Sequence, residues 1–276
     1  MRSPVPDYLS EILDACGEDG GALAAYIPEL ASADPDRLAV CLSTIDGTLY
    51  AAGDTGTEFS IQSISKPFVY ALALAERGLD DVLGWIGVEP SGEAFDELSL
   101  ERESRRPRNP MINAGALTAH ALIGDPADDV TTRVERVRRL LSDLAGRELH
   151  VDASIYESEM SQAHRNLAIA HMLRSYGVIS QDPEDVVRGY TQQCAVSVTT
   201  ADLATMAATL AAGGVQPTTG TQVVPAQVAR QVLGVMMSCG MYDAAGDWMT
   251  TVGFPAKSGV SGGILGVMPG QLGVAT

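Results

Sequence analysis

Strand patterns occur near both ends of this chain, whereas helical patterns fill its middle. Near the start, LAVCLS (38–43) and TLYAA (48–52) flank Asp46-Gly47, a strong signal for a β-hairpin. After residue 252, short apolar runs separated by glycine-rich turns again predict strands. Because each strand must bury its apolar face, the simplest fold brings the two ends together. We therefore expect one antiparallel sheet built from both ends of the chain.

Helical spacing of apolar residues recurs between these strands, and also ahead of the first one. Helices are expected at residues 7–16, 60–78, 81–86, 114–123, 130–145, 158–176, 184–194, 201–212 and 225–239. The predicted fold class is α/β in the α+β sense, an antiparallel sheet flanked by helices with an all-helical subdomain inserted. The sheet subdomain is expected to comprise residues 1–62 plus 200–276, and the helical subdomain residues 63–199. A functional site is expected at their junction, where clefts form.

Composition excludes several classes of function. The chain is 46% hydrophobic and 19% charged, so it can bury a substantial core as one large domain or two intimate ones. A formal net charge of −17 argues against nucleic-acid and anionic-membrane partners, because both prefer basic surfaces. No apolar stretch is long enough to span a bilayer. The four cysteines lie far apart with no Cys-x-x-Cys pair, which is typical of reduced thiols, so we expect a cytoplasmic protein. The histidine spacing predicts no metal site.

Lysine is rare in this chain. Of its 18 basic residues only two are lysines, Lys66 in FSIQSISKPF and Lys257 in PAKSGV. Arginine keeps its proton near neutral pH, whereas a desolvated lysine can lose its proton. A Ser-x-x-Lys pattern such as Ser63 to Lys66 also arises by chance, and each lysine taken alone could be an ordinary surface charge. The second lysine, in a Lys-Ser-Gly segment, makes chemistry the better interpretation of both.

Ser63 and Lys66 share one face of the expected helix, with their Cβ atoms about 5–6 Å apart. A serine hydroxyl is a poor nucleophile until a base takes its proton. Lysine can be that base when its pKa falls from about 10.4 toward neutrality, a bias of roughly 4 kcal/mol that burial and a helix N-terminus help to supply. A backbone N–H of the Lys257 strand, with the N–H of Ser63, would hold an oxyanion. Ser-x-x-Lys combined with Lys-small-Gly is typical of the serine β-lactamase and penicillin-binding superfamily.

Longer motifs carry a more specific resemblance through nearly the whole chain. In order, they are AYIPELA, FSIQSISKPF, GVEPSG, NPMINAGAL, YESEMSQAHRNLAIA, GYTQQC, DLATMAATLAAGG, GMYDAAGDW and PAKSGVSGGI. With these motifs the chain resembles the serine-dependent glutaminase family, whose catalytic domain is β-lactamase-like. The resemblance implies hydrolysis of L-glutamine to L-glutamate and ammonia, with no metal or organic cofactor. It also implies a homo-oligomer, either a dimer or a tetramer.

The resemblance implies roles for individual residues. Ser63 would be the acylated nucleophile and Lys66 its general base, while Tyr190 or Tyr242 would carry a proton toward the leaving ammonia. The substrate-binding positions are Tyr26, Ser63, Asn113, Glu159, Asn166, Tyr190, Tyr242 and Val260.

The chemistry of glutamine agrees with this set. Glu159 is a natural partner for the α-ammonium group, and Asn113 and Asn166 are natural donors to the α-carboxylate. The N–H groups of Val260 and Ser63 would hold the carboxamide oxygen. Apart from the resemblance, the spacing of Glu159 and Asn166 also supports a shared site, because it would place both on one face of the helix expected at 158–176.

Two departures from the family pattern keep other functions open. Ser261 stands where the family usually has glycine, and its side chain is expected to narrow the pocket or shift the oxyanion strand. The C-terminal strand and closing helix of the family are also expected to be missing. The alternatives are another serine acyl-transferase or hydrolase of the β-lactamase superfamily, and a non-catalytic binding protein with a decayed site.

Overall fold

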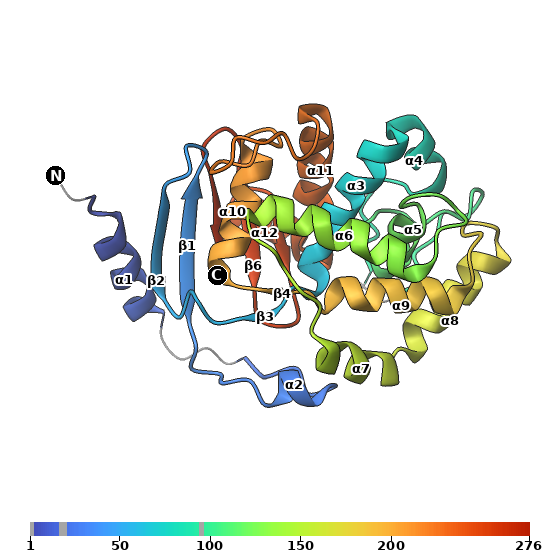
Figure 1. Cartoon of the computed structure of the whole chain (residues 1–276), viewed down its shortest axis with the longest axis horizontal. Helices are drawn as coiled ribbons and strands as arrows, with labels where there is room; N and C mark the ends of the chain where they lie inside the picture. Colours follow the sequence, from blue (N-terminus) through green and yellow to red (C-terminus); the bar gives the residue numbers. More distant parts are fainter. Residues whose placement is uncertain (1–2, 17–20, 94–96) are drawn as a thin grey trace.

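The structure is a computed structural model and describes residues 3–16, 21–93 and 97–276. Five strands form its main sheet, in the order β2-β1-β7-β6-β5 (Figure 1). Their bounds are β1 (Ala39–Thr44), β2 (Leu49–Gly53), β5 (Ala256–Ser258), β6 (Ile264–Met268) and β7 (Leu272–Ala275). Every neighbouring pair in this sheet is antiparallel. The predicted fold class is therefore confirmed.

The two ends of the chain meet in the centre of the sheet. β1 pairs with β7, placing Cys41 opposite Ala275, and its other edge pairs with β2. The β1–β2 turn contains Gly47 at φ +87, a backbone conformation that residues with a side chain rarely adopt. The hairpin predicted around Asp46-Gly47 is thus confirmed, and so is the pairing of strands from opposite ends of the chain.

Most of the contacts between helices and this sheet come from α10 (Thr200–Ala211) and α1 (Val5–Ala15). α10 packs against β1, β6 and β7, and α1 packs against the edge strand β2 (Figure 1). A Cβ on Gly273 would come within 2.3 Å of the backbone nitrogen of Ala208, so glycine is needed for β7 and α10 to approach this closely. This close contact holds α10 against the centre of the sheet.

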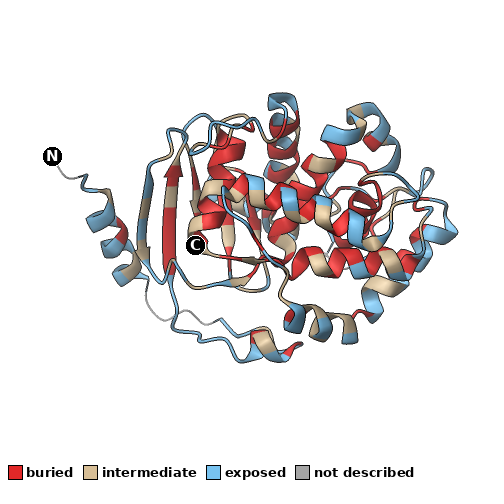
Figure 2. Cartoon of the chain, viewed as in Figure 1, coloured by how far each residue is buried: buried red, intermediate tan, exposed pale blue. Residues whose placement is uncertain are grey.

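The other helices lie mostly on the larger, helical side of the molecule (Figure 1). They are α2 (Pro28–Ala31), α3 (Lys66–Arg77), α4 (Leu79–Trp85), α5 (Asn113–Ala121), α6 (Val130–Ala145), α7 (Ala153–Ser161), α8 (His164–Ser175), α9 (Pro183–Cys194), α11 (Ala226–Cys239) and α12 (Ala245–Thr251). Short connecting elements are η1 (Gln62–Ser65), η2 (Tyr242–Ala244) and the paired strands β3 (Phe59–Ser60) and β4 (Ser197–Val198). Figure 2 shows buried residues running through β1, α9 and α10, whereas α1, α2 and α7 bury few.

Three expectations about the helices need correction. The single helix expected at 158–176 is wrong, because the chain breaks at Gln162 and Ala163 and forms α7 and α8. The segment SQAH at this break contains neither proline nor glycine, so no residue there signals a helix end. The helix expected from residue 60 begins instead with the 3₁₀ turn η1, ahead of α3. The helices α2 and α12 were not predicted.

The described residues contain no helix that is at once long enough and apolar enough to cross a bilayer.

Candidate active site

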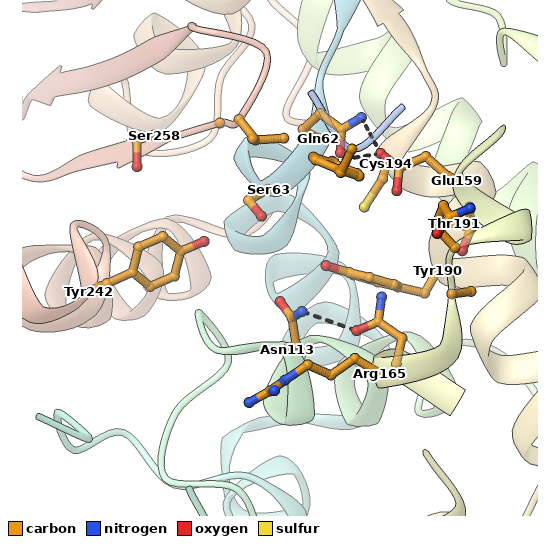
Figure 3. A pocket seen from close by; sticks show the side chains of 16 residues that line it. Gln62, Ser63, Asn113, Glu159, Arg165, Tyr190, Thr191, Cys194, Tyr242 and Ser258 are labelled. Carbon is orange, nitrogen blue, oxygen red and sulfur yellow. Dashed lines mark hydrogen bonds between the residues drawn. The ribbon is translucent and has the colours of Figure 1, made fainter. Parts of the chain in front are cut away.

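A cavity of about 430 Å³ opens where η1, α5, α7, α8, α9, η2 and the loop after β5 meet. Its lining includes every position that the sequence resemblance assigned to substrate binding: Tyr26, Ser63, Asn113, Glu159, Asn166, Tyr190, Tyr242 and Val260. The hydroxyls of Tyr242 and Tyr190 point toward Ser63 from opposite sides (Figure 3). Residues from both ends and the middle of the chain therefore converge on one cavity.

The turn that carries Ser63 has an unusual backbone. Gln62, immediately before Ser63, adopts φ +50, a region that costs a residue with a side chain about 1–3 kcal/mol. Its side-chain amide donates to Ser60 Oγ at 3.1 Å and to Glu159 Oε1 at 3.0 Å. These contacts hold Gln62 in this conformation, so Ser63 is presented to the cavity by a fixed turn.

Lys66 lies directly behind this turn, as the first residue of α3, and is only 1% exposed. Its Nζ donates to Asn113 Oδ1 at 2.7 Å and to the Tyr242 hydroxyl oxygen at 3.3 Å. The amine is thus shielded from solvent and held close to the turn that carries Ser63. Lys66 does not itself line the cavity.

Asn113 owes its place to a glycine. A Cβ on Gly115 would lie 1.9 Å from the carbonyl oxygen of Asn109, so only glycine lets the preceding turn fold back against the start of α5. This turn places Asn113 between two other site residues. Its Oδ1 accepts from Lys66, and its Nδ2 donates to Asn166 Oδ1 at 3.0 Å.

Tyr242 lies between the two lysines of the chain. Lys66 Nζ is 5.4 Å from the centroid of its ring, and Lys257 Nζ is 3.9 Å from it. Burial raises the pKa of Tyr242, but the positive charges of Lys66 and Lys257 and hydrogen bonds from Lys257 and Ser63 outweigh it, so the pKa falls to about 7. The same site lowers the pKa of Lys257 to about 8, chiefly through burial. The phenol can therefore lose its proton near neutral pH.

The approach of η2 to the sheet also depends on a glycine. A Cβ on Gly240 would lie 1.9 Å from the carbonyl oxygen of Ala256, so glycine lets the end of α11 pack against β5. That contact brings Tyr242 over Lys257. Lys257 is fully buried, and its Nζ donates to the carbonyl oxygen of Ser258 at 2.8 Å.

Glu159 forms an acidic wall of the cavity. Its Oε1 accepts from the Tyr26 hydroxyl at 2.9 Å. It also accepts from the Gln62 amide (Figure 3). Burial raises the pKa of Glu159, and these two hydrogen bonds partly oppose that rise. A half-buried carboxylate of this kind is a suitable partner for an ammonium group. Glu159 and Asn166 reach the same cavity from two helices, rather than from the single helix face that their spacing suggested.

The loop between β5 and β6 closes the cavity beside Ser63. Cβ atoms on Gly259 and Gly263 would come within 3.1 Å of Ile64 and 2.9 Å of Phe59, so the glycines let this loop lie against the turn that carries Ser63. Val260 lines the cavity from this loop. The expectation that Ser261 narrows the pocket is wrong, because its Oγ donates to the carbonyl oxygen of Ser60 at 2.7 Å and the residue does not line this cavity.

Several lining residues were missed in the sequence: Gln62, Gln162, Ala163, Arg165, Thr191, Cys194, Ser258 and Gly259. Gln62 and Ser258 adjoin residues that were singled out, so adjacency was the available signal. Cys194 gave none; burial raises the pKa of its thiol to about 12. No group of three or more His, Cys, Asp or Glu side chains in the described part of the chain is arranged to hold a metal ion.

Comparison with known proteins identifies the family of this chain. The model of the Glutaminase family matches residues 21–276. The chain belongs to the glutaminase family. The glutaminase of Corynebacterium efficiens is 57% identical over the whole of this chain, which covers 66% of that relative. The glutaminase of Corynebacterium glutamicum is 58% identical, and the chain covers 67% of it. The resemblance found in the sequence is therefore confirmed, and the chain spans about two thirds of the length of these relatives.

Solved structures have the same fold. Mglu in its tris and glutamate form superposes with a TM-score of 0.96 at 54% identity, covering all of this chain and 61% of Mglu. The probable glutaminase ybaS superposes with a TM-score of 0.92 at 38% identity, covering 98% of this chain and 88% of that protein. The β-lactamase-like architecture predicted for the chain is therefore that of the family.

Proposed function

We propose that this chain hydrolyses L-glutamine to L-glutamate and ammonia through an acyl-enzyme on Ser63. The observation that carries the proposal is the contact of Lys66 with Tyr242 behind Ser63, at one side of a cavity that also presents the Glu159 carboxylate. Relatives named glutaminase, and a crystal structure of Mglu in its glutamate form, support the choice of substrate. The cavity, at about 430 Å³, is large enough for a free amino acid.

Substrate binding in this proposal uses the chemistry of the three polar groups of glutamine. The Glu159 carboxylate binds the α-ammonium group, which compensates for the burial that raises the pKa of Glu159. The side-chain amides of Asn113 and Asn166 lie together and bind the α-carboxylate. The carboxamide then lies at Ser63, with its oxygen held by the N–H groups of Ser63 and Val260.

The base in this proposal is the Lys66–Tyr242 pair. The Tyr242 phenol can lose its proton near neutral pH, and the hydrogen bond from Lys66 stabilises the phenol oxygen, so the pair can accept a proton from Ser63. The pair takes the Ser63 proton while Ser63 Oγ attacks the carboxamide carbon. It returns the proton to the departing nitrogen as the C–N bond breaks and ammonia leaves. Water then attacks the Ser63 ester by the reverse proton movements, and glutamate is released.

The two tyrosines take different roles in the proposed mechanism. Tyr242 relays the proton, because its hydroxyl contacts Lys66 and its pKa lies at about 7. Tyr190 is almost fully buried, and burial raises its pKa well above the usual value for a phenol. It therefore stays protonated and serves as a hydrogen-bond donor to the substrate.

The decisive experiment measures ammonia release from glutamine by the purified protein and by Ser63→Ala. We expect release by the parent and a loss of at least 10³-fold in the variant, because no other group replaces the acylated oxygen. Ser238→Ala, a change in α11 outside the cavity, is the matched control and should keep the parent rate. Hydrolysis of nitrocefin without ammonia release would favour another hydrolase of the superfamily. Glutamine binding without ammonia release would favour the binding protein.

Three further expectations extend this proposal. The division into residues 1–62 plus 200–276 and residues 63–199 is supported by the position of η1, where the sheet side joins the helical side. A cytoplasmic location is supported by the free thiols of all four cysteines. Assembly as a dimer or tetramer rests on the family alone, and light scattering after gel filtration tests it.

A further inference from the structure

A continuous chain of buried hydrogen bonds connects α5 to the peptide group just before the nucleophile. His120 Nδ1 lies 3.1 Å from Gln193 Oε1, and Gln193 Nε2 donates to Ser65 Oγ at 2.9 Å. Ser65 Oγ in turn donates to the carbonyl oxygen of Gln62 at 2.7 Å. The side chains that form it lie at 0 to 1% exposure. None of His120, Gln193 and Ser65 lines the cavity, and the mechanism above uses none of them.

All the hydrogen bonds in this series run in the same direction, from His120 toward Gln62. Because Gln193 uses its amide nitrogen to donate to Ser65, its oxygen must accept, and His120 Nδ1 must carry the hydrogen. Burial lowers the pKa of His120 to about 4, so the ring stays neutral at working pH and keeps this tautomer. Every link therefore donates toward the Gln62 carbonyl oxygen.

That carbonyl belongs to the same peptide group as the N–H of Ser63. A peptide group is planar, so fixing the direction of the carbonyl also fixes the direction of the N–H. Donation to the carbonyl oxygen polarises the group and strengthens the N–H as a donor, and a chain of aligned hydrogen bonds increases this effect. The hydrogen bond from Ser65 adds to the side-chain contacts of Gln62 in holding this peptide, which follows a strained φ of +50.

A glycine in α9 makes room for the His120 imidazole, and burying the polar side chains of this network is unfavourable by itself. A Cβ on Gly189 would lie 2.2 Å from His120 Nε2, so α9 has a glycine where the imidazole approaches it. Placing an imidazole, an amide and a hydroxyl in a core position is unfavourable unless each is satisfied. Apolar side chains would fill the same space without that penalty, which indicates that the direction of the hydrogen bonds matters.

We propose that His120, Gln193 and Ser65 are positioning residues that orient and polarise the Ser63 N–H as an oxyanion donor. The inference rests on the proposed function, because it assigns an oxyanion to this site. It differs from a purely structural role in one measurable respect. An oxyanion develops only in the transition state, so the network should affect kcat far more than the affinity for glutamine or glutamate.

The test compares Ser65→Ala and Gln193→Met with Thr118→Val. Thr118 is a fully buried residue of α5 whose hydroxyl donates only to Ala114 of its own helix, so its substitution matches the loss of a buried hydrogen bond without touching the network. We expect each network variant to lose about 10- to 100-fold in kcat, while KM for glutamine and Kd for glutamate stay within about twofold. The double variant should lose little more than the worse single variant, because both break one chain.

Ser65→Ala removes a single oxygen atom, so it keeps the test available when Gln193→Met does not fold. Thermal melting and glutamate binding establish that each variant is folded. A kcat loss equal to that of Thr118→Val, or a parallel weakening of glutamate binding, overturns this inference while the parent still releases ammonia. Absence of ammonia release by the parent overturns the proposed function itself, and this inference with it.

Discussion

Lys257 Nζ lies 3.9 Å from the centroid of the Tyr242 ring, over the face of the phenol whose hydroxyl contacts Lys66. The two lysines come from distant parts of the sequence, one at the start of α3 and one in β5. A cation over an aromatic face is attracted to the ring, and it also stabilises a negative charge on the phenol oxygen. In the proposed mechanism, Lys257 would therefore act on the reaction through Tyr242.

Replacing Lys257 with methionine should move the acidic limb of the pH profile upward. Burial raises the pKa of Tyr242, and removing one of the two cations that lower it to about 7 leaves that rise less opposed. Tyr242 then keeps its proton up to a higher pH. We expect kcat/KM at pH 7 to fall about tenfold for each unit by which the pKa rises, with recovery at alkaline pH.

Lys257→Arg is the matched control, since it keeps the positive charge near the ring and should leave the acidic limb closer to its original position. The measurement is kcat/KM for glutamine between pH 5 and 9. An acidic limb that stays in place in Lys257→Met would show that Lys257 does not influence the ionisation of Tyr242.

Replacing Glu159 with glutamine should weaken binding of the substrate ammonium group. Loss of a charge-assisted contact costs about 1.5–3 kcal/mol, so KM for glutamine should rise roughly 10- to 100-fold. Glu157→Gln, an exposed change on the same helix, should leave KM unaltered. Glutaramate, which lacks the ammonium group, should be hydrolysed equally by the parent and by Glu159→Gln. A similar loss with both substrates would mean that Glu159 does not bind the ammonium group.

Much of this site was predictable because its residues belong to long motifs, and the hairpin was predictable from a single turn dipeptide. The division of 158–176 into α7 and α8 was not, since tertiary packing ends α7 where no local breaker stands. Pairing across the site was also invisible in the sequence. The contacts Lys66–Tyr242 and His120–Gln193 join distant segments, and no periodicity or spacing reports which buried polar groups meet.

Tyr26→Phe should raise KM for glutamine most strongly at acidic pH. The Tyr26 hydroxyl donates to Glu159 and lowers its pKa, against the burial that raises it. Without this hydrogen bond the pKa of Glu159 rises further, so a larger fraction of the carboxyl is protonated, and unable to bind an ammonium group, as the pH falls. We expect about a 3- to 10-fold rise in KM at pH 5 and a smaller rise at pH 8. The same increase at both pH values would point to lost contact area instead. Tyr8→Phe, at an exposed position of α1, is the control.

Asp202→Ala should destabilise the fold without a direct effect on chemistry. Asp202 accepts both hydrogen bonds of a bidentate pair with Arg147, at 2.8 and 2.6 Å, and its carboxylate also caps α10 through the backbone N–H of Thr199. Its side chain is 8% exposed, so the Ala variant removes a nearly buried acceptor from the Thr199 N–H and leaves Arg147 with Glu58 and the Glu148 carbonyl oxygen as acceptors. We expect a loss of about 2–4 kcal/mol in the free energy of unfolding, measured with urea at pH 7.

Asp185→Ala, which breaks an exposed pair with Arg188, is the control and should change the free energy of unfolding by less than about 1 kcal/mol. Equal losses in the two variants would show that the Arg147–Asp202 pair contributes no more than a surface ion pair.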